Sequence, residues 1–279
     1  MIQPEAWSKN SDMCLKSSKF YMNKYKNLFN WKSDESILEF GMGDGRNSME
    51  SLWPYLPTNF KEYIGTDVSK IMVEHASKQA TNDRMKFMPL DIACPNMSKD
   101  FISRFDHIFS FFVMHWVQNS RQAFLNMYNM LKPGGELFLI FVERTSADEV
   151  YDSLSKHPKW RKYDHERLIS PFHFSTNAQK EYEKILCETG FSDYSLELKK
   201  WSYAFPSEES FEELFFSTNP IIAEVAEQDR EEYKKFYMEK MKNGSLNWAS
   251  KCDKTGKKVF HSSFKAFVVF AKKPLENSD

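Results

Sequence analysis

The stretch Ile37-Leu38-Glu39-Phe40-Gly41-Met42-Gly43-Asp44-Gly45-Arg46 decides the fold of this chain. An apolar run ends in the acid Glu39, and glycine follows at three alternate positions. Glycine adopts positive φ and has no side chain, so such a turn lets the backbone approach a ligand closely. The pattern predicts a buried strand that ends in a tight turn, followed by a helix from Arg46 to Trp53 with Asp44 as its cap.

The spacing of the three glycines distinguishes two kinds of ligand. The dinucleotide-binding fingerprint is G-x-G-x-x-G, whereas this turn reads G-x-G-x-G, with Asn47 after Arg46. Glu39 also places a carboxylate beside the turn, and a carboxylate repels phosphate and suits a cation or a ribose. The turn resembles motif I, D/E-x-G-x-G-x-G, of the class I methyltransferases that use S-adenosylmethionine. A glycine turn that binds no ligand is the alternative.

The composition is that of a globular chain of 279 residues without a strong net charge. Its 38 Lys and Arg nearly cancel its 39 Asp and Glu, so no nucleic-acid partner is expected. No apolar run approaches the length of a membrane span, and we expect a soluble, cytoplasmic chain without a membrane partner. Cys14, Cys94, Cys187 and Cys252 lie far apart, which argues against a metal site or disulfides and for a reducing compartment.

Two further predicted strands also carry acids at their ends. In the strand from Tyr63 to Asp67, Asp67 lies about twenty residues beyond the glycine turn, where an acid meets ribose hydroxyls in mononucleotide-binding folds. The third strand, from Met85 to Ile92, carries Asp91 near its end. Because the carboxyl ends of parallel strands share one edge of a sheet, we expect Glu39 to lie beside these two acids. Such a crevice suits a sulfonium and a ribose.

The remaining pattern continues the alternation of strands and helices. A fourth strand from Phe105 to Phe112 is followed by a helix from Ser120 to Leu131. Lys132-Pro133-Gly134-Gly135 ends this helix, and Glu136 to Val142 is a fifth strand. The alternation predicts an α/β fold with a doubly wound, mostly parallel, seven-stranded sheet.

The C-terminal half should complete this sheet. Strands from Gly190 to Phe205 and from Ser263 to Ala271 fit an antiparallel hairpin that closes it. Helical lid segments are expected around 206–255, where Glu231 and Lys235 should pair on a surface helix, and 251–258 should be a solvated loop. We therefore expect a single domain, 1–279, with three parts: an N-terminal cap helix within 1–34 that starts near Asp12, a cofactor-binding core at 35–142 and the C-terminal half of the sheet at 143–279.

Beyond the glycine turn, the chain resembles the insect juvenile hormone acid O-methyltransferases. The most specific stretch runs from Phe105 to Asn119 and contains His115-Trp116-Val117-Gln118-Asn119. The resemblance spans roughly residues 1 to 272 and is weakest from 206 to 255. Its other stretches are Ile64 to Ser69, Leu90-Asp91-Ile92, Tyr128 to Pro133, Glu149-Val150-Tyr151, Lys159-Trp160 and Ile169-Ser170-Pro171.

This resemblance implies S-adenosyl-L-methionine as the cofactor and a sesquiterpenoid acid, such as farnesoic acid or juvenile hormone acid, as the substrate. The product would be its methyl ester. In similar enzymes a Trp and a Gln hold the acceptor carboxylate; Trp116 matches the Trp, whereas Cys14 occupies the position of the Gln. A thiol is a much weaker donor than an amide, so this position puts the natural substrate in doubt. The residues implied in cofactor binding are Glu39, Gly41, Gly43, Gly45, Asp67, Val68, Asp91, Ile92 and Ser110.

The chemistry of the acceptor limits the roles of the site residues. A carboxylic acid has a pKa of about 4 to 5, so it is already ionised at neutral pH and needs no general base. We therefore expect His115 and Trp116 to position the acceptor, with packing in the fold as the alternative for each. The candidates for lining an isoprenoid pocket are Phe111, Phe112, Trp201, Tyr203 and Phe205.

Two other functions remain open. One is methyl transfer to an amine, phenol or arsenic species, although a phenol or ammonium acceptor requires a base or a metal and arsenic requires paired cysteines. The other is a non-catalytic protein that binds the cofactor, which the change at Cys14 favours and the intact glycine turn disfavours. The sequence leaves open which acid is methylated and whether the protein is a monomer or a homodimer.

Overall fold

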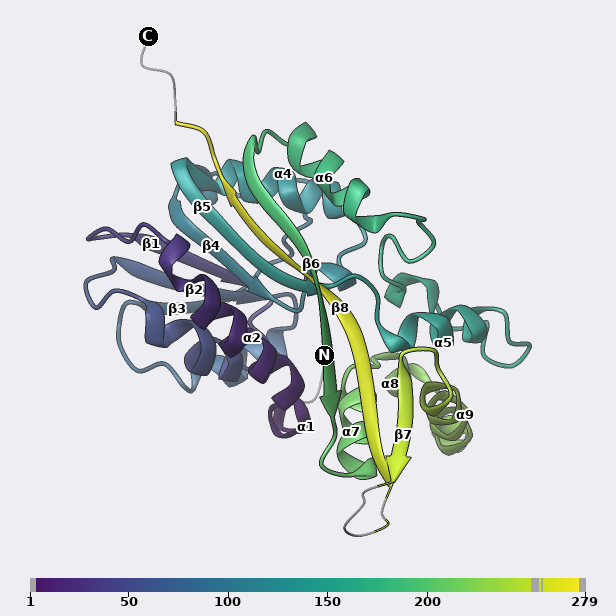
Figure 1. Ribbon diagram of the computed structural model, residues 1–279. Helices are drawn as coiled ribbons and strands as arrows, with labels where there is room; N and C mark the ends of the chain where they lie inside the picture. Colours follow the sequence, from purple (N-terminus) through teal and green to yellow (C-terminus); the bar gives the residue numbers. More distant parts are fainter. Residues whose placement is uncertain (1–3, 252–255, 257, 276–279) are drawn as a thin grey trace.

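The structure, a computed structural model, describes residues 4–251, 256 and 258–275. Its centre is an eight-stranded sheet of order β3-β2-β1-β4-β5-β8-β6, with β7 paired to β8 (Figure 1). The five parallel strands are β1 (Ser36–Phe40), β2 (Glu62–Asp67), β3 (Met85–Pro89), β4 (Phe105–Phe111) and β5 (Leu131–Val142). The antiparallel strands are β6 (Asp193–Ala204), β7 (Asn247–Lys251) and β8 (Lys258–Lys272). The predicted α/β fold and its closing hairpin are confirmed.

Helices lie on both faces of the sheet and beyond one end of it. Those beside the sheet are α2 (Asp12–Tyr25), α3 (Lys70–Ser77), α4 (Ser120–Met130) and α6 (Ala178–Glu188), whereas α1 (Pro4–Asn10) lies between α2 and the second group of helices. A second group gathers with β7 around the first half of β8 (Figure 1): α5 (Ser146–Ser155), α7 (Glu208–Ser217), α8 (Ile221–Glu224) and α9 (Arg230–Lys242). This group encloses an apolar cluster of its own, built around Trp160, Tyr233 and Tyr237.

The burial of β5 explains why the central strands are unbroken apolar runs in the sequence. Its side chains alternate between two apolar clusters, one on each face of the sheet. Leu137, Leu139 and Phe141 pack on the face of α4 and α6. Phe138, Ile140 and Val142 pack on the face of α2. Both faces of this strand are therefore dry, as the sequence pattern indicates.

Several elements differ from those predicted from the sequence. The helix expected from Arg46 to Trp53 is a π-helical turn (Ser48–Leu52) followed by a 3-10 turn (Trp53–Tyr55). Pro54 lies in the 3-10 turn and has no N–H to donate, so a regular helix cannot continue there. β7 is an additional strand inside the range 206–255, where helical segments were expected.

Other differences concern single residues. Strand β3 ends at Pro89, so Asp91 lies in the turn that follows it. Glu231 pairs with Lys234, one turn along α9, and not with Lys235: the Nζ–Oε1 distance is 3.0 Å. Cys252 and most of the loop expected at 251–258 lie outside the described residues.

Three further features of the described part of the chain concern its cysteines, metal ligands and helix lengths. The cysteines Cys14, Cys94 and Cys187 are free thiols. No group of three or more His, Cys, Asp or Glu side chains that could hold a metal ion occurs there. No helix in this part of the chain is long and apolar enough to cross a membrane.

A buried ionic cluster joins β1, β4 and β5 near their amino ends. His107 Nε2 lies 3.2 Å from a carboxylate oxygen of Glu35, and its Nδ1 lies 3.3 Å from Glu136. Lys272 Nζ lies 3.1 Å from the other oxygen of Glu136. Burial alone lowers the pKa of His107, but the hydrogen bonds and charges of the two carboxylates outweigh it and raise the pKa. The two carboxylates therefore favour the protonated form of His107 inside the sheet.

We expect Glu136→Gln to lower the free energy of unfolding by about 2 kcal/mol at pH 6, because buried His107 then keeps only one of its two carboxylate partners, Glu35. A raised folded-state pKa gives stability that is fully present below the unfolded value of about 6.5 and is lost as pH rises through the folded value. The deficit of the variant should therefore shrink at pH 9. Urea denaturation at both pH values measures this, with exposed Glu239→Gln as the control. An equal deficit at both pH values would contradict the charged state of His107.

Candidate active site

The glycine turn after β1 depends on backbone conformations that favour glycine. Gly41, Gly43 and Gly45 have φ values of +67°, +62° and +85°. At Gly41 there is also no room for a side chain, because a Cβ atom would lie 2.2 Å from Cγ2 of Val113. The turn therefore packs directly against the segment that follows β4.

A cavity of about 530 Å³ opens at this turn. It is lined by seven of the nine residues predicted to bind the cofactor: Glu39, Gly41, Gly43, Asp67, Val68, Asp91 and Ile92. The other two, Gly45 and Ser110, donate hydrogen bonds to residues that line the cavity. Ser110 Oγ donates a hydrogen bond of 2.9 Å to the Phe40 carbonyl, and the Gly45 N–H donates one of 3.2 Å to the Met42 carbonyl.

The three acids that line this cavity are held in different ways. Glu39 is 1% exposed and accepts a 2.6 Å hydrogen bond from the Tyr63 hydroxyl. Burial raises the pKa of Glu39 to about 7, and the bond from Tyr63 opposes this. Asp67 accepts the N–H of Gly43 at 3.0 Å and that of Ser69 at 2.8 Å, so it ties the glycine turn to the end of β2.

The third acid, Asp91, is exposed and accepts the Ala93 N–H at 2.9 Å. Among the described residues, no Lys or Arg lines this cavity. Each carboxylate oxygen has a second lone pair, so the acids can still accept hydroxyl or ammonium hydrogens from a ligand. The cavity suits a ligand that carries a cation and a ribose, and it offers no side-chain cation for a phosphate.

A second, smaller cavity of about 80 Å³ adjoins the first. Five residues line both cavities, so they form the junction between them: Trp7, Cys14, Phe112, Trp116 and Thr218. His115 also lines the small cavity. Most of its remaining wall is apolar and includes Met13, Val142, Leu214, Phe215 and Phe264. The fold thus brings the predicted cofactor residues and the predicted acceptor residues to adjacent cavities.

Part of the wall of the small cavity was not predicted from the sequence. Leu214, Phe215 and Phe264 come from α7 and β8, and no local motif marks them. Phe111 and Phe112 do line the large cavity, as the aromatic candidates were expected to do. Trp201, Tyr203 and Phe205 line neither cavity. Trp201 packs against Phe20 and Tyr21 of α2, and Tyr203 and Phe205 belong to the apolar cluster of the second helix group.

The polar groups at the junction are uncharged. His115 is 5% exposed, and burial lowers its pKa to about 4 although the charge of Asp148 opposes the shift. Burial raises the pKa of the Cys14 thiol to about 12. Trp116 lies against His115, with 4.8 Å between the ring centroids, and its indole N–H can only donate. A neutral imidazole, a thiol and an indole can orient a ligand, but none of them is a strong base.

The N-terminal helices close over the large cavity. Arg46, next to the glycine turn, donates to the Ser8 carbonyl and pairs with Asp12 at 2.8 Å. Trp7, Ser11 and Cys14 thereby line the cavity. The cap predicted within 1–34 is thus two helices, α1 and α2, joined to the cofactor turn through Arg46.

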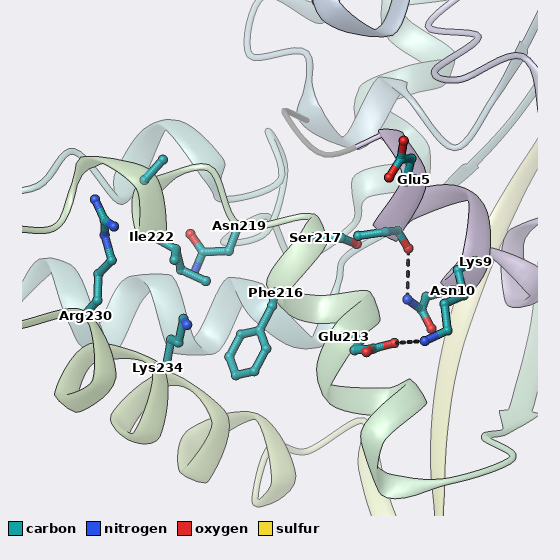
Figure 2. A pocket seen from close by; sticks show the side chains of 12 residues that line it. Glu5, Lys9, Asn10, Glu213, Phe216, Ser217, Asn219, Ile222, Arg230 and Lys234 are labelled. Carbon is teal, nitrogen blue, oxygen red and sulfur yellow. Dashed lines mark hydrogen bonds and ion pairs between the residues drawn. The ribbon is translucent and has the colours of Figure 1, made fainter. Parts of the chain in front are cut away.

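A larger groove of about 630 Å³ lies on the outer side of α1 (Figure 2). Lys9 and Glu213 pair across it at 3.4 Å, and Arg230 donates its Nε–H to the Val225 carbonyl at 3.1 Å. None of the residues predicted from the sequence to bind cofactor or acceptor lines this groove. Ser217 and Asn219 line the groove, whereas Thr218 between them lines the two inner cavities. The residues predicted to bind cofactor and acceptor are therefore found at the inner cavities, although the groove is larger.

Comparison with known proteins agrees with this geometry. Residues 38–137 match the family model of a methyltransferase domain. The chain is 29% identical to juvenile hormone acid O-methyltransferase of Drosophila melanogaster over 265 residues, which cover 93% of this chain and 88% of the relative. It is also 29% identical to the Bombyx mori protein of the same name over 238 residues, 84% of this chain and 85% of that one.

Solved structures share the fold. YcgJ of Bacillus subtilis matches with a TM-score of 0.58 at 18% identity and covers 93% of this chain and 99% of its own. Phosphoethanolamine N-methyltransferase 2 of Haemonchus contortus, in complex with S-adenosyl-L-methionine, matches with a TM-score of 0.50 at 16% identity, covering 96% of this chain and 53% of that one.

The chain has the fold of the class I methyltransferases, and its residues 38–137 match a methyltransferase domain, a class of enzyme whose usual cofactor is S-adenosyl-L-methionine. Within that class the chain is homologous, along most of its length, to the juvenile hormone acid O-methyltransferases. The resemblance predicted from the sequence is confirmed.

We expect Asp67→Ala to weaken cofactor binding by about 1–3 kcal/mol, the typical loss of a hydrogen bond to a charged group. Calorimetric titration with S-adenosylhomocysteine measures the change. Asp83→Ala, at an exposed acid away from the cavity, is the matched control. Thermal denaturation must accompany the titration because Asp67 also holds Gly43. Unchanged affinity would remove Asp67 from the cofactor site.

Proposed function

We propose that this protein transfers the methyl group of S-adenosyl-L-methionine to the carboxylate of a small hydrophobic acid, such as a sesquiterpenoid acid, and releases a methyl ester. The observation that carries the proposal is the junction of the two cavities. An acid-lined cavity for the cofactor meets a mainly apolar cavity at Cys14 and Trp116. The two relatives named juvenile hormone acid O-methyltransferase support the same acceptor.

The protonation states at the junction favour a carboxylate over other acceptors. A carboxylate is ionised at neutral pH and needs no base. A phenol or an ammonium group must lose a proton first, and the side chains at the junction include no strong base, since the pKa of His115 is about 4. Arsenic acceptors require paired thiols, whereas Cys14 is the only cysteine that lines either cavity among the described residues.

The chain's part in the reaction is to position and to exclude water. When bound, S-adenosyl-L-methionine supplies a methyl group on a positively charged sulfur. Trp116 and His115 orient the acceptor carboxylate, because their ring N–H groups can donate to it. Phe112, Leu214 and Phe264 keep the acceptor's side of the junction apolar. Holding two reactants in line can contribute roughly 7–11 kcal/mol to lowering the barrier.

The direct test is methyl transfer from labelled S-adenosyl-L-methionine to a panel of farnesoic, juvenile hormone, medium-chain fatty and aromatic acids. We expect label in an extractable, base-labile ester of a hydrophobic acid. Trp116→Phe keeps an aromatic ring but removes the N–H donor, and it should lower kcat/KM about tenfold, the effect of one hydrogen bond to a charged group. Measurable cofactor binding without a labelled ester of any acid would contradict carboxyl methylation.

Cys14 favours one other function, a protein that binds the cofactor without turnover. The thiol stays protonated and donates weakly, where similar enzymes have an amide. We expect Cys14→Gln to raise kcat/KM on farnesoic acid about tenfold or more, because a restored hydrogen bond to a charged group contributes roughly 1.5–3 kcal/mol. Cys14→Met, which adds volume without a donor, is the control. A fall in activity with both variants would show that this position does not face the carboxylate.

A further inference from the structure

Some polar groups that line the small cavity already donate a hydrogen bond within the protein, whereas others have a donor available for a ligand. Thr145 donates its hydroxyl hydrogen to Asp148 at 3.0 Å, and Ser146 donates to Asn247 at 2.9 Å. Thr218 donates to the Phe215 carbonyl at 3.1 Å. These hydroxyls have no hydrogen left for a ligand. An anionic acceptor must therefore find its donors elsewhere in the wall.

Arg144 is the remaining strong donor. Among the described residues it is the single Lys or Arg that lines either cavity. It lies between β5 and the capping box that starts α5 at Thr145. Its neighbour Glu143 pairs with Lys265 at 3.2 Å, and the Arg144 side chain itself makes no hydrogen bond or ion pair with any described residue. All five guanidinium N–H donors are available.

Arg144 is the positive charge that faces the acids of the large cavity across the junction. The large cavity is lined by Glu39, Asp67 and Asp91, and its described wall contains no cation. A carboxylate that approaches the junction therefore meets negative charge on the cofactor side, apart from the cofactor's own sulfonium. Arg144 and Trp116 line the same small cavity, so the guanidinium lies on the acceptor's side of the junction.

We propose that Arg144 is a positioning residue that binds the acceptor's carboxylate and selects ionised acids over neutral molecules of the same shape. A guanidinium pairs with a carboxylate through two parallel hydrogen bonds, which fix its orientation as well as its charge. Arg144 then supplies the strong donor that Cys14 lacks. The inference rests on the proposed function, because it concerns the same acceptor.

The test compares Arg144→Gln and Arg144→Lys with Arg161→Gln, a change at an exposed arginine outside both cavities. Farnesoic acid, and separately the neutral alcohol farnesol, is titrated into protein saturated with S-adenosylhomocysteine. Binding is followed by tryptophan fluorescence, since Trp7 and Trp116 line the junction. We expect Arg144→Gln to weaken acid binding at least tenfold and raise KM equally, with kcat within about threefold. Farnesol binding should not change.

Two control variants, Arg144→Lys and Arg161→Gln, distinguish the loss of the guanidinium from a general effect of substitution. Arg144→Lys should recover part of the acid affinity, and Arg161→Gln should behave like the unchanged protein. Equal affinity for S-adenosylhomocysteine in all variants shows that each one folds. Acid affinity that is unchanged in Arg144→Gln, or equal losses for acid and alcohol, would overturn the assignment.

The outcomes also separate this inference from the proposed function. Acids that bind through Arg144 but are never methylated would leave the anion site standing and refute carboxyl methylation. Acids that are methylated equally well by Arg144→Gln would refute the inference alone. If no acid binds the unchanged protein, both fail.

Discussion

The close contact between the backbone at Gly41 and the side chain of Val113 is the constraint on which the site depends. A Cβ atom at Gly41 would lie 2.2 Å from Val113, and the positive φ of the turn disfavours a side chain as well. This contact brings the end of β1 against the segment after β4. Trp116 follows Val113 by three residues, so the same contact places the acceptor's side of the site beside the cofactor cavity.

Charge is divided between the two sides of the junction. The large cavity has carboxylates such as Asp67 and Asp91, and the acceptor side has the proposed cation Arg144. His115 and Cys14, which lie between them, are uncharged because burial shifts the pKa of each toward the neutral form. Such an arrangement aligns a cation and an anion without a proton transfer, which is what methyl transfer to a carboxylate requires.

Much of the fold followed from local sequence, whereas half of the site did not. The glycine turn and Asp67 could be predicted because strand ends, glycines and acids at fixed spacing are local features. The apolar wall could not, because α1, α7 and β8 contribute Trp7, Leu214 and Phe264, which only tertiary packing brings together. Aromatic composition alone was misleading for Trp201, which packs against α2.

We infer that the glycine turn and its acids select a sulfonium nucleoside and exclude ligands held by phosphate. Calorimetric titration tests it most directly, with S-adenosyl-L-methionine added alone and then in competition with NAD. We expect one S-adenosyl-L-methionine to bind per chain and NAD to leave its affinity unchanged, because Asp67 and Asp91 line that cavity and repel a pyrophosphate, and no Lys or Arg lines its described wall. Saturable NAD binding that displaces S-adenosyl-L-methionine would contradict the account.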